Sequence, residues 1–179
     1  PDKSSNVGGY NALALDENNY PHISYYDVTN TALKFSRFDG SAWAAVEVDN
    51  SGAVGGYTDI AFNPNDRKTH VSYTDLVNET LKYAVKDGLN WTTEVVENTV
   101  VVRVGTSLIL NRGNPRISYH NATNDTLRMA SLQPSGDWTN TDINGDALGG
   151  ECSSFAFDSD GYEHISYAKG RNHVRYSYR

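Results

Sequence analysis

Short apolar stretches recur along the chain at a regular interval. A segment centred on Ile/Val-Ser-Tyr occurs at residues 21–27, 69–75, 115–121 and 163–169, which places the Ser-Tyr pair at positions 24, 72, 118 and 166. The resulting intervals of 48, 46 and 48 residues are typical of repeat architectures. The pattern predicts four repeats, with boundaries near residues 1–48, 49–96, 97–143 and 144–179.

A full repeat contains four segments with the character of short β-strands, separated by turns rich in Asp, Asn and Gly. The first segment is apolar throughout, as at residues 13–15 and 60–62, which predicts a strand covered on both faces. The Ser-Tyr segment is the second, and the third alternates apolar and basic residues, as at residues 81–84. The fourth begins with a Trp and ends on an aliphatic residue five positions later.

Four short antiparallel strands in a full repeat describe the blade of a β-propeller, so we predict an all-β fold with about four blades of 47 residues. A β-sandwich has no reason to repeat its four-strand pattern at this interval, and a solenoid needs end caps that the sequence does not show. The last repeat stops after its third segment and lacks an outer strand. A single domain over residues 1–179 and a part of a larger propeller both agree with this pattern.

Three interpretations of the incomplete last repeat stay open. The chain is a piece of a longer array, one component of a ring that another polypeptide completes, or a four-bladed ring whose last blade has three strands. A strand edge without a neighbour tends to recruit other chains. We therefore expect the chain to associate with another chain or to belong to a longer propeller.

Composition and charge narrow the class of partner. The formal net charge of -7 and the scattered Lys and Arg residues argue against binding nucleic acid. No run of 18 apolar residues predicts a membrane span, and no motif calls for a cofactor. Cys152 is the single cysteine, which excludes an internal disulfide. Since its equivalents are Tyr10, Tyr57 and Gly105, we expect Cys152 to be a buried or half-buried filler.

Repeated polar residues on the second strand are expected to have structural roles. His22, His70 and His164, with Arg116 in the third repeat, occupy one position, and packed sheets lie too far apart for their side chains to share a metal ion readily. The repeated serine is expected to bond neighbouring backbone, and the tyrosine after it to fill the space between sheets. Asp158 and Asp160 form part of a calcium-type loop, for which a hairpin turn is the alternative.

The candidate ligand-binding residues are aromatic and acidic side chains near the fourth strand of each repeat. The aromatic rings are suited to stacking on sugar rings, and the nearby carboxylates to accepting hydrogen bonds from sugar hydroxyls. The alternative role of the aromatic residues is to pack the outer strand. The candidates are Trp43, Trp91, Trp138, Asp39, Asp87 and Asp137.

The repeat unit resembles tandem propeller repeats in predicted secreted or surface proteins of bacteria and archaea. The resemblance is carried by Pro-His-Ile-Ser-Tyr-Tyr-Asp at 21–27, then Leu-Lys-Phe/Tyr, then Asp-Gly-x-x-Trp, and it extends over all four repeats. A looser similarity connects the Tyr-rich strand and the Asp-Gly-x-x-Trp hairpin to fucose-binding and tectonin-type lectin propellers. The Asp-box of sialidases has the pattern Ser-x-Asp-x-Gly-x-x-Trp. The segment 36–43 departs from that pattern by one position, because Asp39 and Gly40 are adjacent.

These resemblances imply a propeller outside the cell or at the cell surface. We expect a non-enzymatic binding or scaffold module that recognises a glycan or a protein. The alternative is a carbohydrate-active propeller enzyme, such as a sialidase-like hydrolase or a lyase.

Overall fold

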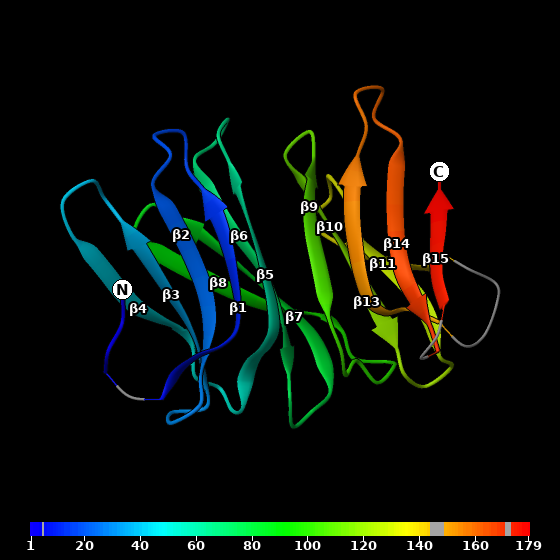
Figure 1. The fold of residues 1–179 in the computed structure, drawn as a ribbon, viewed down its shortest axis with the longest axis horizontal. Coiled ribbons are helices and arrows are strands. Elements are labelled where there is room, and N and C mark those ends of the chain that lie inside the picture. Colours follow the sequence, from blue (N-terminus) through cyan, green and yellow to red (C-terminus); the bar gives the residue numbers. More distant parts are fainter. Residues whose placement is uncertain (5, 144–148, 171–172) are drawn as a thin grey trace.

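The computed structural model of the chain describes residues 1–4, 6–143, 149–170 and 173–179. These residues form strands, turns and loops, and the strands assemble into four separate antiparallel sheets (Figure 1). The predicted all-β propeller of repeated blades is confirmed. Within the described ranges, no helix has the length and hydrophobicity that a membrane crossing requires.

Each sheet corresponds to one predicted repeat and is called a blade below. Within a blade, the strands pair in chain order. Blade 1 contains β1 (Val7–Leu15), β2 (Pro21–Asp27), β3 (Ala32–Phe38) and β4 (Trp43–Asp49), and blade 2 contains β5 (Val54–Asn63), β6 (Lys68–Asp75), β7 (Thr80–Asp87) and β8 (Asn90–Glu97). Blade 3 contains β9 (Thr106–Asn111), β10 (Asn114–Asn121), β11 (Thr126–Leu132) and β12 (Trp138–Asp142), and the three strands described in blade 4 are β13 (Glu151–Phe157), β14 (Glu163–Lys169) and β15 (His173–Tyr178).

The blades follow one another in an arc. The first strands are neighbours, because β1 lies against β5, β5 against β9, and β9 against β13. Figure 1 shows β4 of blade 1 at one end of the arc and β15 of blade 4 at the other. The first strands therefore line the inner side of the arc, as the propeller prediction requires.

In the described part of the chain, the hydrophobic core consists of three clusters, each lying between two successive blades. Leu33 and Phe35 of blade 1 pack against Ile60 and Tyr73 of blade 2, and similar clusters lie between blades 2 and 3 and between blades 3 and 4. Burial of the first strand on both faces is confirmed in blades 2 and 3, where Ile60 and Leu108 are buried and Ala61 and Ile109 pack against the cluster on the other face. In blade 4 the burial holds for one face, since Phe155 is buried and Ala156 is exposed. It is wrong for Leu13, which is exposed because no blade covers that side of blade 1.

This exposure also contradicts the four-bladed ring among the three interpretations of the last repeat. A closed ring would bury the outward sides of blades 1 and 4 against each other. Leu13 of blade 1 and Val174 of blade 4 are instead both exposed.

The first strands of blades 1, 2 and 4 carry β-bulges that reorient one residue each. The register shifts next to Tyr10, Tyr57 and Cys152, and the φ angles of these residues are 49°, 50° and 50°. The bulge brings the rings of Tyr10 and Tyr57 to a centroid distance of 4.4 Å. Cys152 is exposed, so its expected role as a buried filler is wrong. In a regular strand, side chains alternate between the two faces of the sheet. The bulge residue, with its positive φ, breaks this alternation, so its side chain does not enter a packed face as those of its neighbours do.

The repeated serine joins neighbouring blades through side chains. Ser24 accepts a 2.8 Å hydrogen bond from Thr58 of blade 2. Ser72 is 2.8 Å from the Thr106 hydroxyl, and Ser118 is 2.8 Å from the Ser153 hydroxyl. The expectation of a backbone partner is wrong, because the first strand of the next blade presents a hydroxyl at this point.

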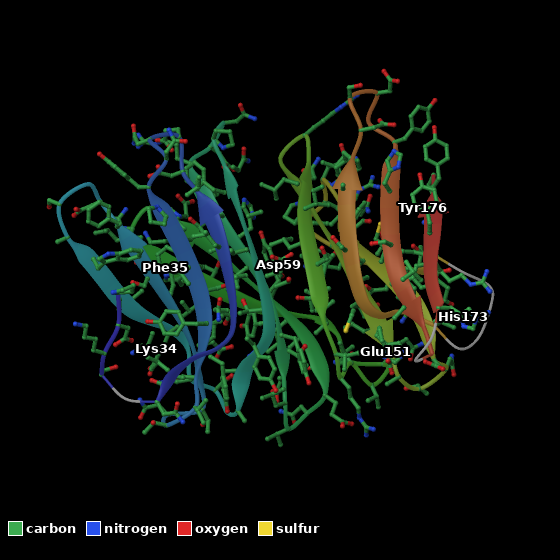
Figure 2. The ribbon with its side chains drawn as sticks, in the orientation of Figure 1. Lys34, Phe35, Asp59, Glu151, His173 and Tyr176 are labelled. Carbon is green, nitrogen blue, oxygen red and sulfur yellow. The ribbon has the colours of Figure 1, made fainter. Side chains whose placement is uncertain are left out.

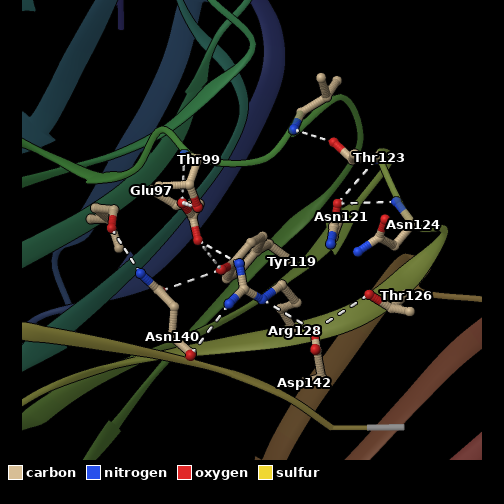
Figure 3. A network of polar contacts seen from close by, with 12 residues as sticks. Glu97, Thr99, Tyr119, Asn121, Thr123, Asn124, Thr126, Arg128, Asn140 and Asp142 are labelled. Atoms are coloured by element: carbon tan, nitrogen blue, oxygen red, sulfur yellow. Dashed lines mark hydrogen bonds and ion pairs between the residues drawn. The ribbon is translucent and has the colours of Figure 1, made fainter. Parts of the chain in front are cut away.

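A carboxylate at the end of a fourth strand forms a second connection between blades. Figure 3 shows the network around Glu97, which ends β8 of blade 2. Glu97 accepts a 3.1 Å hydrogen bond from the Tyr119 hydroxyl and forms a 2.6 Å ion pair with Arg128, both from blade 3. The repeated tyrosine thus fills the space between sheets, as predicted, and its hydroxyl also finds a buried acceptor.

Candidate functional site

The tryptophans that begin the fourth strands lie on the side of their blade that faces the preceding blade. The Trp91 ring contacts Phe35 of blade 1 in an edge-on arrangement, with centroids 5.1 Å apart. Trp138 contacts Tyr83 of blade 2 in the same way, at 5.2 Å. Trp43 has no preceding blade in the described arc and packs against Phe38 of its own blade, at 5.6 Å.

The space beside Trp138 is closed by a direct hydrogen bond. The Trp138 indole N–H donates to Glu94 Oε1 of blade 2 at 2.9 Å. Asn140 of the same strand donates to the Val96 carbonyl at 3.1 Å. These two bonds join the outer strands of blades 2 and 3.

The corresponding space beside Trp91 is open. Val46 of blade 1 stands at the position that Glu94 occupies in blade 2, and the neighbouring Glu47 accepts a 2.6 Å hydrogen bond from Asn50 of its own blade. The buried indole N–H of Trp91 has no hydrogen-bond partner in the described part of the chain. A groove of about 560 Å³ lies between the two blades at this point. The groove is lined by Phe35, Arg37, Ala44, Val46, Glu47, Val48, Lys86, Leu89, Asn90 and Trp91.

Two cationic side chains distinguish this groove from the next interface. Arg37 of blade 1 and Lys86 of blade 2 line it, and the equivalent positions between blades 2 and 3 hold the apolar Val85 and Leu132. The described structure shows no hydrogen bond or ion pair for the exposed Arg37 guanidinium. Burial, with a smaller contribution from the like charge of Arg37, lowers the pKa of the Lys86 amine.

A second hollow of about 400 Å³ adjoins the groove and shares Arg37 and Lys86 with it. Its other lining residues include Asp16, Glu17, His22, Phe62, Asp66, Arg67 and Asp87. Glu17 is ion-paired with Arg67 at 2.7 Å, and Asp87 with Lys68 at 3.1 Å. These ion pairs partly neutralise the carboxylates of Glu17 and Asp87. The edge that the hollow shares with the groove therefore stays basic, through Arg37 and Lys86.

His22 forms part of the wall of this hollow and connects the two blades. Its Nδ1 lies 3.0 Å from the Thr69 hydroxyl of blade 2. Burial lowers the pKa of His22 against the opposing effect of Asp16. The imidazole is therefore neutral near pH 7 and acts as a hydrogen-bonding group.

The other members of the histidine position also make packing contacts. His70 bonds to the Tyr83 hydroxyl within blade 2, and His164 Nδ1 lies 2.7 Å from the Tyr176 hydroxyl within blade 4. Arg116 forms an ion pair with Glu163 of the next blade. Among the described residues, no group of three or more His, Cys, Asp or Glu side chains is arranged to hold a metal ion.

The three candidate aspartates do not share one site. Asp39 is in the β3–β4 turn, where its Oδ1 accepts hydrogen bonds from the Ser41 and Ala42 amides, both at 2.9 Å. Asp137 accepts a 2.8 Å hydrogen bond from the Ser135 hydroxyl in the β11–β12 turn. Asp87 alone among the three lines the hollow beside the Trp91 groove.

The proposed calcium residues lie in the β13–β14 turn. Asp158 Oδ1 accepts hydrogen bonds from the amides of Asp160 and Tyr162, at 3.0 Å and 2.8 Å, and Oδ2 lies 3.1 Å from His164 Nε2. The Asp158 carboxylate thus serves the hairpin turn and an adjacent histidine.

Sequence reasoning identified Trp91 and Asp87 but missed the residues that make the groove distinctive. Arg37, Glu47 and Lys86 come from β3, β4 and β7, and Asn50 follows β4. A comparison of repeats position by position carries the signal, since Arg37 stands where repeats 2 and 3 have Val85 and Ser131.

Comparison with known proteins finds likeness in structure and none in sequence. No family model matches the chain, and no curated protein matches it. The resemblance to bacterial and archaeal propeller repeats therefore stays a prediction.

Several solved propellers are similar in fold. An AofleA variant from Arthrobotrys oligospora, with three arginines replaced by alanine, gives a TM-score of 0.67 at 12% identity, covering 95% of this chain and 53% of that chain. The fucose-recognising six-bladed lectin of Aleuria aurantia gives 0.63 at 16% identity, covering 94% and 57%. The intramolecular trans-sialidase of Ruminococcus gnavus gives 0.59 at 18% identity, covering 94% and 42%. The chain thus spans about half the length of these proteins, and at such low identity the likeness shows that it shares their β-propeller fold.

Proposed function

We propose that the chain is a non-enzymatic carbohydrate-binding propeller module that works outside the cell or at the cell surface, and that its glycan binds in the groove between blades 1 and 2. The observation that carries this proposal is the open groove beside Trp91. At the next interface, the equivalent space is closed by the bond between Trp138 and Glu94. A site where one repeat departs from the others is a better candidate for recognition than positions that every blade uses for packing.

The groove offers the groups that a sugar ring needs. Trp91 supplies an aromatic surface, and Arg37 supplies guanidinium donors. Glu47 adds carboxylate acceptors, of which Oε1 is bonded to Asn50. An apolar wall with a few convergent polar groups is the usual form of a small-ligand site. Sugars present both an apolar ring face and a rim of hydroxyls, so this groove matches them on both counts.

Fucosylated glycans are the first ligands to test. The Aleuria aurantia structure describes fucose recognition by a six-bladed propeller of similar fold. Because identity to that lectin is only 16%, fucose is a starting point, and a broad glycan array is the appropriate screen.

The carboxylates of the structure favour binding over hydrolysis. A glycosidase needs two carboxyl groups on opposite sides of the scissile bond, one of them protonated through a raised pKa. Among the described residues, Glu47 is the one carboxylate that lines the groove. Burial raises the pKa of the Asp59 carboxyl group. Its Oδ2 accepts a 2.7 Å hydrogen bond from the Leu108 amide, and it does not line the groove.

A glycan array probed with the wild-type chain and with Trp91→Ala tests the proposal. We expect the wild type to bind a defined set of glycans and the variant to lose that binding. Trp91→Phe keeps an aromatic ring and removes the indole N–H, so it should retain weakened binding. Thr92→Ala, an exposed change on the same strand, is the matched control and should bind normally. Equal binding by Trp91→Ala and the wild type would show that the glycan does not bind beside Trp91. Release of sugar from any bound glycan would refute the non-enzymatic assignment.

A further inference from the structure

Every internal blade has two packed sides. Its preceding side, which faces the lower-numbered blade, presents an aliphatic residue from the first strand and the Trp of the fourth strand. Its following side presents an aliphatic and a larger residue from the third strand, such as Leu81 and Tyr83 in blade 2. The same pattern of contacts joins blades 1 and 2, and blades 2 and 3.

The preceding side of blade 1 has this composition, and no blade in the described part of the chain packs on it. Leu13 is 62% exposed, whereas its equivalent in blade 2, Ile60, is 5% exposed. Trp43 is also exposed, and it lacks the aromatic partner that Trp91 and Trp138 find in their preceding blades.

The following side of blade 4 is exposed in the same way. Val174 is 85% exposed, against 0% for its equivalent Leu81 in blade 2. Tyr176 is 61% exposed, against 3% for Tyr83. Figure 2 shows Tyr176 on β15 at one end of the arc, far from Phe35 of blade 1.

These two exposed sides are complementary to each other. His164 holds the Tyr176 hydroxyl as His70 holds that of Tyr83, and Tyr83 packs against the Trp of the following blade. Tyr176 is therefore arranged to pack against a tryptophan in the position of Trp43.

A glycine on the preceding side of blade 1 adds an independent indication. Gly55 of blade 2 has a φ of +105° and lies so close to Leu33 that a Cβ built on it would be 2.8 Å from the Leu33 Cα. Gly150 approaches Leu127 in the same way, with a corresponding distance of 2.9 Å. Gly8 has the same conformation, with a φ of +101°, and no atom within 4 Å. It is shaped for the close approach of an aliphatic residue such as Val174.

The polar connection on this side is already made within the chain. Asp2 accepts a 2.7 Å hydrogen bond from the Tyr25 hydroxyl and pairs with Lys34 at 2.5 Å. It thus occupies the place that Asp49 and Glu97 occupy at the internal interfaces. The preceding side of blade 1 therefore has its polar connection and lacks only the apolar residues that would pack on it.

We propose that a second copy of this chain supplies this cover, with the following side of its blade 4 docked on the preceding side of blade 1. The contact is head-to-tail, so each copy uses two different surfaces. Two copies bring eight sheets together, which lies within the usual range of four to eight blades for propellers. The contact repeats the internal blade interface, and its specificity follows from the pairing of Tyr176 with Trp43 and of Val174 with Gly8.

Sedimentation and light scattering over a range of concentrations test association of the wild-type chain. We expect a concentration-dependent species of at least twice the mass of one chain. Leu13→Lys blocks one side of the contact and Val174→Lys the other, and each variant alone should sediment as a single chain. Val77→Lys, which changes an exposed valine in the β6–β7 turn of an internal blade, is the matched control and should associate like the wild type. Circular dichroism verifies that the variants are folded.

Mixing the two blocked variants tests the head-to-tail geometry. Leu13→Lys keeps an intact blade 4 side and Val174→Lys an intact blade 1 side, so the mixture should form a one-to-one pair although neither variant associates alone. The pair Trp43→Glu and Tyr176→Glu repeats the test if either lysine variant fails to fold. A monomeric wild type overturns the proposal. So does loss of association through only one of the two sides, or a mixture that does not pair.

Discussion

The Tyr73 hydroxyl of blade 2 donates a 2.7 Å hydrogen bond to Asp49 Oδ2 at the end of blade 1, and Lys82 meets the same oxygen at 2.5 Å. All three side chains are buried. Burial by itself would raise the pKa of Asp49, but the hydrogen bonds from Lys82, Tyr73 and Ser51 together outweigh it and hold the pKa at about 2. Blades 2 and 3 are therefore each fastened to the preceding blade by a carboxylate, Asp49 and Glu97 respectively, in addition to their apolar packing.

Replacing Asp49 with Asn should destabilise the chain by about 2–3 kcal/mol near pH 7. The variant loses the charged acceptor and leaves the Lys82 ammonium buried without its counter-ion. Because the folded pKa of Asp49 lies below its unfolded value, this stabilisation is present above about pH 4. It is lost as the pH falls toward about 2. Urea unfolding at pH 7, 5, 4 and 3 measures the difference between the two proteins.

The matched control for this measurement is Asp160→Asn, an exposed aspartate in the β13–β14 turn. It should unfold like the wild type at every pH. A gap between wild type and Asp49→Asn that stays constant down to pH 3 would show that the carboxylate charge is not responsible.

His70 should make stability depend on pH in a different window. Burial lowers its pKa from 6.5 to about 4. Since the unfolded chain binds a proton at higher pH than the folded chain does, acidification from about pH 6.5 to 4 favours unfolding, by up to about 3 kcal/mol. His70→Gln should flatten this part of the pH profile, and the exposed His173→Gln should leave it unchanged. Thermal unfolding between pH 7 and 4 gives the two slopes, and equal slopes for wild type and His70→Gln would contradict the assignment.

The sequence predicts the blade well because each blade is formed by consecutive strands whose apolar and polar residues follow a strong repeating pattern. Short strands that pair in chain order place the Ser-Tyr segment second in every sheet, as the spacing of Ser24 and Ser72 indicates. What it does not predict are the partners across blades. The Ser24 hydroxyl meets Thr58, and Cys152 turns out of the packed faces at a bulge, because both depend on how two sheets approach each other.

The candidate groove was harder to predict because it arises from differences between repeats. Trp91 and Trp138 occupy the same position in the pattern, yet one indole N–H is bonded to a glutamate and the other is not. The cause is Val46, which stands in repeat 1 where repeat 2 has Glu94, so no carboxylate meets the Trp91 indole from blade 1.

Arg37→Val tests the charge at the groove directly, because repeat 2 has Val85 at the same position. We expect the variant to fold normally and to bind the glycan about tenfold or more weakly, as loss of one charge-assisted hydrogen bond of 1.5–3 kcal/mol implies. Isothermal titration with the best array ligand measures the change. Arg67→Val, an exposed arginine in the neighbouring hollow, is the control. Unchanged affinity in Arg37→Val would exclude its guanidinium from the site.

Gly55 and Gly8 form a natural matched pair for measuring the close approach between blades. Both have φ angles near +100°, so a Cβ introduces similar backbone strain at each, but only at Gly55 does it meet the Leu33 backbone of another blade. We therefore expect Gly55→Ala to lose about 1–3 kcal/mol more stability than Gly8→Ala, because the clash forces the two sheets apart. Guanidinium unfolding at protein concentrations below the range of self-association isolates this difference. Equal losses would mean that the space between blades 1 and 2 yields easily, and that the glycine serves the bulge rather than the interface.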